Sequence, residues 1–162
     1  PWRTLGDEFT RAGWTDLTHH RAALSVRGVP LAFRGTDDGH LQRDRYHLVA
    51  GPPDPDALIN IAVTHAPYLR LLDAFAGDQM DLILAGHTHG GQVCLPGYGA
   101  LVTNCDIDTR RVKGVSQHTA GGHTSAMHVS AGLGASPFAP YRFACRPEAS
   151  LLTLVARDQR VH

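Results

Sequence analysis

Residues 58–87 read LINIAVTHAPYLRLLDAFAGDQMDLILAGH, and this stretch decides the fold. Its two ends, residues 58–67 and 80–86, contain apolar runs of the length and composition expected of buried strands. Between them, residues 68–77 fit a helix that Gly77 would end. A strand, a helix and a second strand within about 30 residues predict two parallel strands in a sheet that helices cover. We therefore expect an α/β fold.

Further elements are predicted on both sides of this unit. Residues 4–14 are expected to form a short amphipathic helix, and residues 22–40 two short strands joined by a turn at Arg27-Gly28 and followed by a loop. Residues 125–134 and 148–157 look like two more strands, the second at an edge or terminus. Residues 114–126 are expected to be a flexible loop, with His118 and His123 exposed to solvent.

Composition limits the possible partners and setting. The 162 residues suffice for one domain, and 15 basic residues balance 15 acidic ones. Because no net charge attracts polyanions, we expect no nucleic-acid partner, and no apolar run approaches the roughly 20 residues of a membrane span. Three cysteines, Cys94, Cys105 and Cys145, are too few for a disulfide framework and are expected to be free thiols in a cytoplasmic protein.

Histidines follow both strands of the central unit. His65 ends one predicted strand and His87 the next, and the carboxyl ends of neighbouring parallel strands meet at one edge of a sheet. His89 lies two residues beyond His87, so in extended backbone both rings would project to the same side. The flanking Gly86, Gly90 and Gly91 leave room for a ligand. We predict metal ligation, although a histidine at a strand end is commonly only a hydrogen-bonded residue.

These motifs resemble a known family. LAGHTHGGQ (84–92), preceded by VTHAP (63–67), is similar to the calcineurin-like metallophosphoesterase superfamily. Residues 132–154, GLGASPFAPYRFACRPEASLLTL, resemble the end of its bacterial subfamily of membrane-associated phosphoesterases and UDP-2,3-diacylglucosamine hydrolases. LAFRGTDDGH (31–40) resembles a strand and loop of the same subfamily. The resemblance implies the carboxyl-terminal half of a layered α-β-β-α sandwich.

The resemblance also implies a ligand set. His65 and His87 would bind the second ion of a dinuclear metal centre, and His89 would bind the first. The full-length parent would hold two divalent ions (Mn, Fe or Zn), whereas at most one is expected in this chain. Without a bridging carboxylate, neutral imidazoles do not offset the charge of two cations.

Four other residues are candidates for supporting or substrate-side roles. Gln92 lies just beyond the metal loop and would support it. Asp38 and His40 lie in a loop that would reach the substrate side, or else they belong to a solvated turn. Arg142 would contact a phosphate, or else form a structural ion pair with Glu148.

Other motifs of the family are absent before His65. These are an Asp-x-His after the first strand, a Gly-Asp that supplies the bridging carboxylate, and an Asn-His that supplies the proton donor. Asp38 to His40 matches Asp-x-His but follows the wrong elements. We therefore interpret residues 1–162 as a phosphoesterase domain that lacks its amino-terminal part, which agrees with a chain that begins at Pro1. Its catalytic residues stay unknown, and the isolated chain is expected to be inactive.

The leading hypothesis is a metal-dependent hydrolase of phosphodiesters or pyrophosphates. Its substrate would be a small-molecule phosphoester or a lipid headgroup, and the parent would be cytoplasmic or peripheral to the membrane. A second hypothesis is a degenerate, non-catalytic homologue that binds one metal or a partner. A third is a structural α/β domain whose histidines are incidental.

Overall fold

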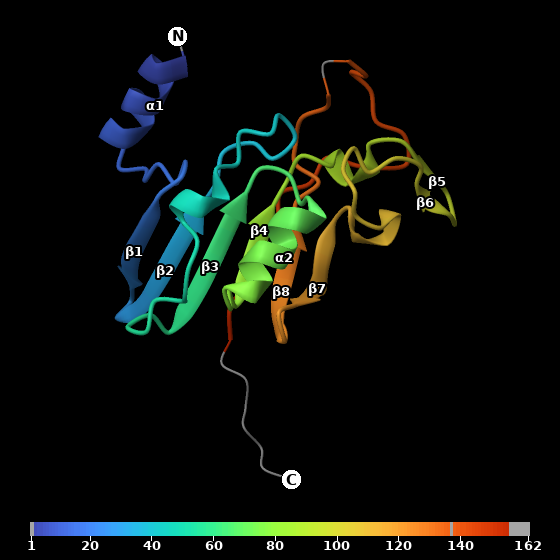
Figure 1. The fold of residues 1–162 in the computed structure, drawn as a ribbon. Helices are drawn as coiled ribbons and strands as arrows, with labels where there is room; N and C mark the ends of the chain where they lie inside the picture. Colours follow the sequence, from blue (N-terminus) through green and yellow to red (C-terminus); the bar gives the residue numbers. More distant parts are fainter. Residues whose placement is uncertain (1, 137, 156–162) are drawn as a thin grey trace.

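A six-stranded mixed sheet forms the centre of the molecule (Figure 1). The computed structural model describes residues 2–136 and 138–155, with side chains from residue 4 onward. The elements are α1 (Trp2–Arg11), β1 (Arg21–Val26), β2 (Val29–Gly35), η1 (Tyr46–Leu48), β3 (Ile59–Thr64), α2 (Leu69–Gly77), β4 (Leu82–Ala85), η2 (His89–Gly91), β5 (Cys94–Leu95), β6 (Gly99–Ala100), η3 (Thr109–Arg111), β7 (Gly114–Ala120) and β8 (His123–Val129). The sheet order is β1-β2-β3-β4-β8-β7, and β5 and β6 form a separate two-stranded ribbon. The predicted α/β fold is confirmed.

The strand–helix–strand unit has the predicted form. β3 and β4 are parallel neighbours, and Thr64 pairs with Ala85 at their carboxyl ends. α2 connects them across one face of the sheet (Figure 1). Because the two strands end level with each other, the residues that follow them begin at one edge of the sheet.

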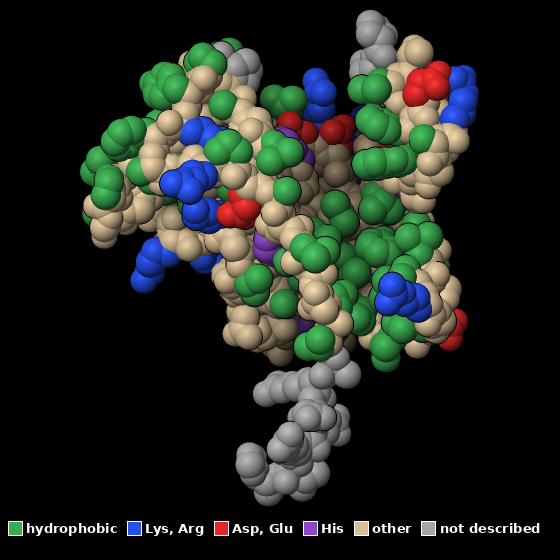
Figure 2. All heavy atoms as spheres, turned by 180° about the vertical axis from the view of Figure 1, so that it is seen from behind, with side chains coloured by type: hydrophobic (Ala, Val, Ile, Leu, Met, Phe, Trp, Pro, Cys, Tyr) green, Lys and Arg blue, Asp and Glu red, His purple; other side chains and the backbone are tan. Residues whose placement is uncertain are grey.

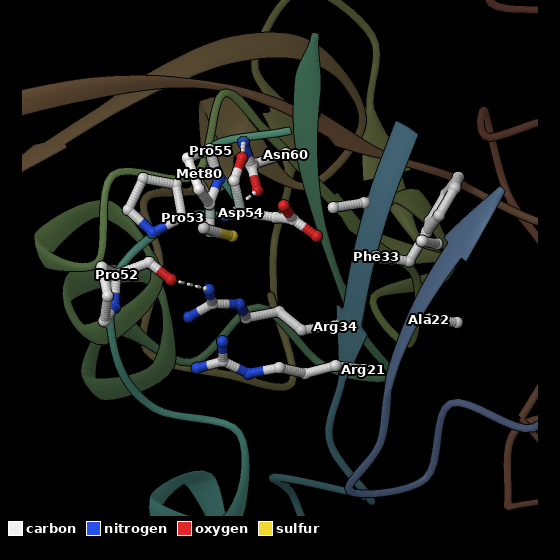
Figure 3. Close-up of a pocket in the computed structure, with 12 residues that line it drawn as sticks. Arg21, Ala22, Phe33, Arg34, Pro52, Pro53, Asp54, Pro55, Asn60 and Met80 are labelled. Atoms are coloured by element: carbon white, nitrogen blue, oxygen red, sulfur yellow. Dashed lines mark hydrogen bonds between the residues drawn. The ribbon is translucent and has the colours of Figure 1, made fainter. Parts of the chain in front are cut away.

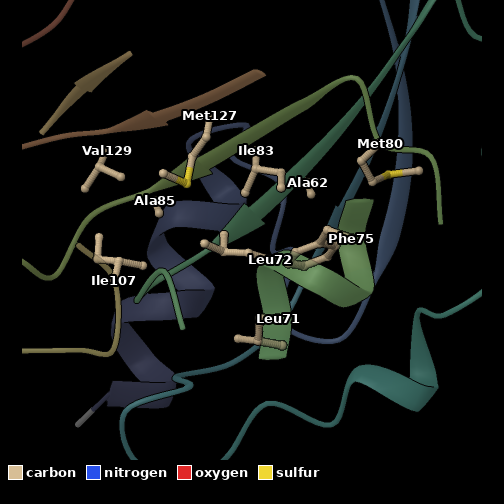
Figure 4. Packing of buried hydrophobic residues seen from close by; sticks show 10 residues of the cluster. All are labelled: Ala62, Leu71, Leu72, Phe75, Met80, Ile83, Ala85, Ile107, Met127 and Val129. Carbon is tan, nitrogen blue, oxygen red and sulfur yellow. The ribbon is translucent and has the colours of Figure 1, made fainter. Parts of the chain in front are cut away.

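Apolar side chains between α2 and the sheet form the main core (Figure 4). Its members are Ala62, Leu71, Leu72, Phe75, Met80, Ile83, Ala85, Ile107, Met127 and Val129. Phe75 and Leu72 of α2 are fully buried, and each contributes about 1.5–3 kcal/mol by leaving water. This packing fixes the two strand ends.

The other face of the sheet also carries apolar residues. Strand alternation directs Val63 and Leu84 away from the α2 core, because their neighbours Ala62, Ile83 and Ala85 belong to it. Figure 2, seen from behind, shows hydrophobic side chains gathered on this side. A sheet that is apolar on both faces, with a helix on one, fits half of an α-β-β-α sandwich.

The prediction of a flexible loop at residues 114–126 is wrong. β7 and β8 pair from Gly114–Val129 to Ala120–His123 as an antiparallel hairpin. Gly121 and Gly122 supply the two left-handed positions of its turn, with φ of 59° and 79°. The polar composition of β7 concealed the strand, and the paired glycines between alternating segments were the signal.

His118 and His123 lie in this hairpin and are not solvent-exposed as predicted. His118 is buried, and its Nε2 lies 2.7 Å from Oδ1 of Asp73 on α2. His123 is half-buried, with Nε2 3.2 Å from the carbonyl of Met80. Partners on α2 and in the loop before β4 therefore hold the two rings.

The predicted strand at residues 148–157 is also wrong for its described part. Residues 148–155 form no strand, and residues 156 and 157 lie outside the described residues. The apolar composition favours a strand, but a strand also needs a neighbour for its backbone hydrogen bonds. The sheet ends at β1 and β7, and the segment extends neither edge. Among the described helices, none has the length and hydropathy to cross a membrane.

Candidate metal centre

Two predicted ligands meet at the carboxyl edge of the sheet. His65 follows β3 directly, and His87 follows β4 after one glycine. The Gly86 amide donates to the His65 carbonyl at 3.0 Å, which continues the strand pairing to the histidines. Nδ1 of His87 then lies 3.0 Å from Nε2 of His65, and their ring centroids are 4.9 Å apart. The sequence placed these two residues correctly.

The loop after β4 is not extended, so the expected geometry of His87 and His89 is wrong. His87 has φ 69°, Thr88 is right-handed helical, and His89 has φ 50° within η2. Gln92 is a third left-handed residue, with φ 54°. Such conformations cost on the order of 1–3 kcal/mol each for residues other than glycine and gather at functional sites. The backbone therefore turns sharply between the two histidines.

Close packing explains two of the glycines in this loop. A Cβ at Gly91 would lie 2.2 Å from Cβ of Ala100, and one at Gly90 would lie 2.8 Å from Sγ of Cys145. Both glycines also have positive φ, 82° and 65°. Only glycine both lacks a Cβ and adopts a positive φ without strain. The loop is thus pressed onto β6 and the segment near residue 145.

Burial alters the proton affinity of His87. Desolvation lowers the pKa of His87 below its ordinary value, and the nearby rings of His65 and His40 act in the same direction. The Asn104 carbonyl and the charge of Asp38 oppose this shift. The shift favours the neutral ring, which is the form of histidine that binds metal.

The loop before η1 brings His40 and Asp38 to the same place. The His40 ring centroid lies 4.6 Å from that of His87, and Nδ1 of His40 lies 2.8 Å from the Tyr68 hydroxyl. Asp38 accepts a hydrogen bond from the His40 amide at 2.7 Å. These contacts place the predicted substrate-side residues beside the His65–His87 pair, within a hydrogen-bonded turn.

His89 does not join this pair. Among the described side chains, no contact links the His89 ring to His65 or His87, and no three His, Cys, Asp or Glu residues form a metal-binding group. The backbone is anchored instead, because Nη1 of Arg142 donates to the His89 carbonyl at 2.9 Å. Two of the three predicted ligands are therefore together, and among the described contacts the third does not join them.

Gln92 and Arg142 hold the loop to the chain beyond residue 130. The buried Gln92 amide donates to Ala139 O at 2.5 Å and accepts from the Ser136 amide at 2.8 Å. Arg142 donates to the carbonyls of residues 89, 131, 132 and 134 and to Sγ of Cys145. These bonds engage all three nitrogens of the guanidinium within the chain itself. Within the described residues no ion pair joins Arg142 to Glu148.

The thiols pack under the same loop. Cys94 and Cys145 are buried and free, as predicted, and both sulfurs lie within 3.4 Å of the Gly90 carbonyl. With Ala100 and Val112 they form a second small apolar cluster. Cys105 is free and half-buried.

Asn104 contacts His87, and the sequence did not predict this contact. Its carbonyl oxygen and its side-chain Nδ2 both lie 3.1 Å from Nε2 of His87. Asn104 follows His87 by 17 residues and has φ 57°. No spacing or motif connects the two positions, so only the folded chain reveals the contact.

A large hollow lies elsewhere, between β1, β2 and the loop at residues 49–55 (Figure 3). It measures about 490 Å³, and none of its lining residues is a predicted ligand. Arg34 donates to the carbonyls of Gly51 and Pro52, at 2.8 Å each, and Arg21 donates to Val49 O at 2.8 Å. The two arginines thus hold, by hydrogen bonds, the loop that forms one wall of the hollow.

Comparisons with known proteins show what the whole chain resembles. The chain is 34% identical over 154 residues to the uncharacterized metallophosphoesterase YkuE of Bacillus subtilis, covering 90% of this chain and 48% of that protein. It is 28% identical over 156 residues to the phosphodiesterase YaeI of Escherichia coli, covering 93% and 51%. It is also 29% identical over 146 residues to the uncharacterized protein YpbG of Bacillus subtilis, covering 90% and 50%. These similarities support the metallophosphoesterase superfamily.

The chain spans about half the length of each of these three relatives. No model of a protein family matches it, and no solved structure matches it.

The named metallophosphoesterase relative implies the use of divalent metal ions, and neutral imidazoles are common ligands of such ions. Nδ1 of His87 and Nε2 of His65 are 3.0 Å apart, which is a hydrogen-bond distance. Two ligands about 2.1 Å from one tetrahedral ion would be about 3.4 Å apart, so the two rings would need to separate slightly to share an ion.

Proposed function

We propose that this chain is the carboxyl-terminal part of a metal-dependent phosphoester hydrolase with a dinuclear centre. The observation that carries the proposal is the 3.0 Å separation of His87 Nδ1 and His65 Nε2 at two adjacent strand ends. The similarity to a metallophosphoesterase and a phosphodiesterase supports the reaction class. The terminal segment at residues 132–154 favours the bacterial membrane-associated and UDP-2,3-diacylglucosamine hydrolase-like subfamily.

His65 and His87 would hold the second ion, and His89 the first. The positive φ of His87 and His89 supports this division, because the backbone between the two rings is not extended. Gln92 and Arg142 keep the turn in place through their contacts with Ser136 and Ala131. Mn, Fe or Zn would suit imidazole ligands combined with carboxylates.

Bound divalent ions would polarise the phosphoryl group of the substrate and activate water. This chain's own residues would neutralise little of that charge, since the His65–His87 pair is neutral when it binds metal. Carboxylate ligands and a proton donor would therefore come from a part that precedes residue 1 in a longer protein. His40 and Asp38, beside His87, would border the phosphoester substrate, either a small molecule or a lipid headgroup.

The same site also allows a non-catalytic function. A degenerate homologue would keep the His65–His87 pair and bind one ion or a partner without turnover. The absence of a described contact between the His89 ring and the pair favours this alternative in the isolated chain, because two imidazoles provide only half of a tetrahedral ligand set.

Metal content and phosphodiesterase activity test the proposal. We expect the isolated chain to bind at most one Zn²⁺ or Mn²⁺ and not to hydrolyse bis(p-nitrophenyl) phosphate. A protein in which the part of YkuE that this chain does not match is joined before residue 1 should bind two ions and be active. Two bound ions and turnover from the 162-residue chain alone would refute the proposal that part of the metal site lies outside this chain.

A further inference from the structure

Asn104 presents two groups of opposite character to one nitrogen of His87. Its backbone carbonyl oxygen and its side-chain Nδ2 each lie 3.1 Å from Nε2. A carbonyl oxygen only accepts a hydrogen bond, whereas an amide NH₂ only donates one. The two groups therefore favour opposite tautomers of the neutral imidazole.

The tautomer decides which atom of His87 can bind a metal. With the proton on Nε2, His87 donates to the Asn104 carbonyl, and Nδ1 keeps a lone pair directed at the His65 side, 3.0 Å from its Nε2. With the proton on Nδ1, His87 donates to His65 and accepts from the Asn104 amide. Only the first arrangement leaves Nδ1 available as a ligand.

We propose, on the basis of the proposed function, that Asn104 is a positioning residue for His87. Its backbone carbonyl holds the proton on Nε2 and so makes Nδ1 the metal-facing nitrogen. Metal-bound histidines commonly donate their other N–H to a carbonyl or carboxylate, which fixes the ring and its tautomer. The side-chain amide of Asn104 acts in the opposite direction and stabilises the metal-free tautomer with the proton on Nδ1.

The backbone of Asn104 explains why this residue type suits the position. Asn104 has φ 57°, and asparagine adopts the left-handed conformation more readily than most residues other than glycine. This conformation directs the carbonyl at His87. Glycine at position 104 would keep the conformation and the carbonyl but lose the amide, whereas valine would disfavour the conformation itself.

Two variants separate these contributions. In Asn104→Gly, His87 should carry its proton on Nε2, and Zn²⁺ should bind equally well or up to about threefold more tightly. In Asn104→Val, the carbonyl contact that favours the proton on Nε2 should be lost, and Zn²⁺ should bind about 10- to 100-fold more weakly. Gln79→Val is the matched control, since Gln79 is exposed, has φ 60° and lies away from the histidines.

Long-range ¹H–¹⁵N NMR spectra distinguish protonated from bare ring nitrogens in the folded, metal-free variants, and calorimetry measures Zn²⁺ affinity. A His87 that keeps its proton on Nδ1 in Asn104→Gly, or an Asn104→Val chain that binds Zn²⁺ as tightly as the Gln79→Val control, would overturn the positioning role. The NMR measurement needs no metal, so it is independent of the proposed function. An Nε2 proton in an Asn104→Gly chain that binds no Zn²⁺ would support the positioning role and count against the metal centre.

Discussion

Nδ1 of His87 lies 3.0 Å from Nε2 of His65, although 22 residues separate the two positions. The parallel pairing of β3 and β4 creates this contact, because Thr64 and Ala85 end the strands level with each other. A metal ion shared by the two rings would need this register.

Removing either ring should therefore abolish most metal binding by the chain. We expect His65→Ala and His87→Ala each to weaken Zn²⁺ binding at least about 10-fold, since one imidazole remains. His47→Ala is the control, because His47 is exposed and lies in η1. Isothermal titration calorimetry measures the three affinities, and equal losses in all three would point to nonspecific binding.

His89 should behave differently in the isolated chain. Its ring is not in contact with the described pair, so we expect His89→Ala to change Zn²⁺ affinity less than about threefold. In an extended protein with both ions, the same substitution should remove one ion, as metal analysis would show. A large loss of affinity in the isolated chain would mean that His89 ligates the same ion as His65 and His87.

Gly91 should tolerate no side chain. A Cβ there would lie 2.2 Å from that of Ala100 at φ 82°, so Gly91→Ala should destabilise the fold by about 2–5 kcal/mol through overpacking and left-handed strain. Gly97→Ala isolates the backbone effect, because position 97 has φ 79° and open space around it. We expect about 1–2 kcal/mol there. Urea unfolding measures both, and equal losses would exclude a role for the Ala100 contact.

The contact between His118 and Asp73 should act as a hydrogen bond more than as an ion pair. His118 is buried, while the Asp73 side chain is 60% exposed, so solvent screens the charge. Asp73→Asn keeps an acceptor and should cost less than about 1 kcal/mol. Asp73→Ala leaves the buried Nε2 without its partner and should cost about 1–3 kcal/mol. Thermal unfolding distinguishes the two variants, and equal losses would show that the charge dominates.

The lowered pKa of His87 predicts a pH dependence. Between this pKa and the ordinary value of 6.5, the unfolded chain binds a proton at His87 and the folded chain does not. The contribution of His87 to folding stability is therefore complete above pH 6.5 and falls as the pH decreases through that window. NMR titration should give His87 a midpoint below pH 6.5. The His87→Gln variant should lose less folding stability than the unaltered chain when the pH is lowered below 6.5. A midpoint at or above 6.5 would contradict the role of burial.

Local pattern was sufficient for the strand–helix–strand unit and for the meeting of His65 and His87. It failed for β7, where a buried His118 interrupts an otherwise polar strand, and for residues 148–155, where an apolar segment has no strand beside it. Both errors have one cause, since the stability of a strand depends on its neighbours as well as on its own residues.

The sequence by itself determined the α/β class, the two strands that end at His65 and His87, and the motif shared with metallophosphoesterases, because apolar periodicity and short motifs are local properties of a chain. Only the tertiary structure decided the left-handed turn at His87 and His89, the carbonyl contacts of Arg142, and the approach of Asn104 to Nε2 of His87. These depend on close packing between segments far apart in the sequence, such as Gly91 against Ala100, which no local pattern specifies.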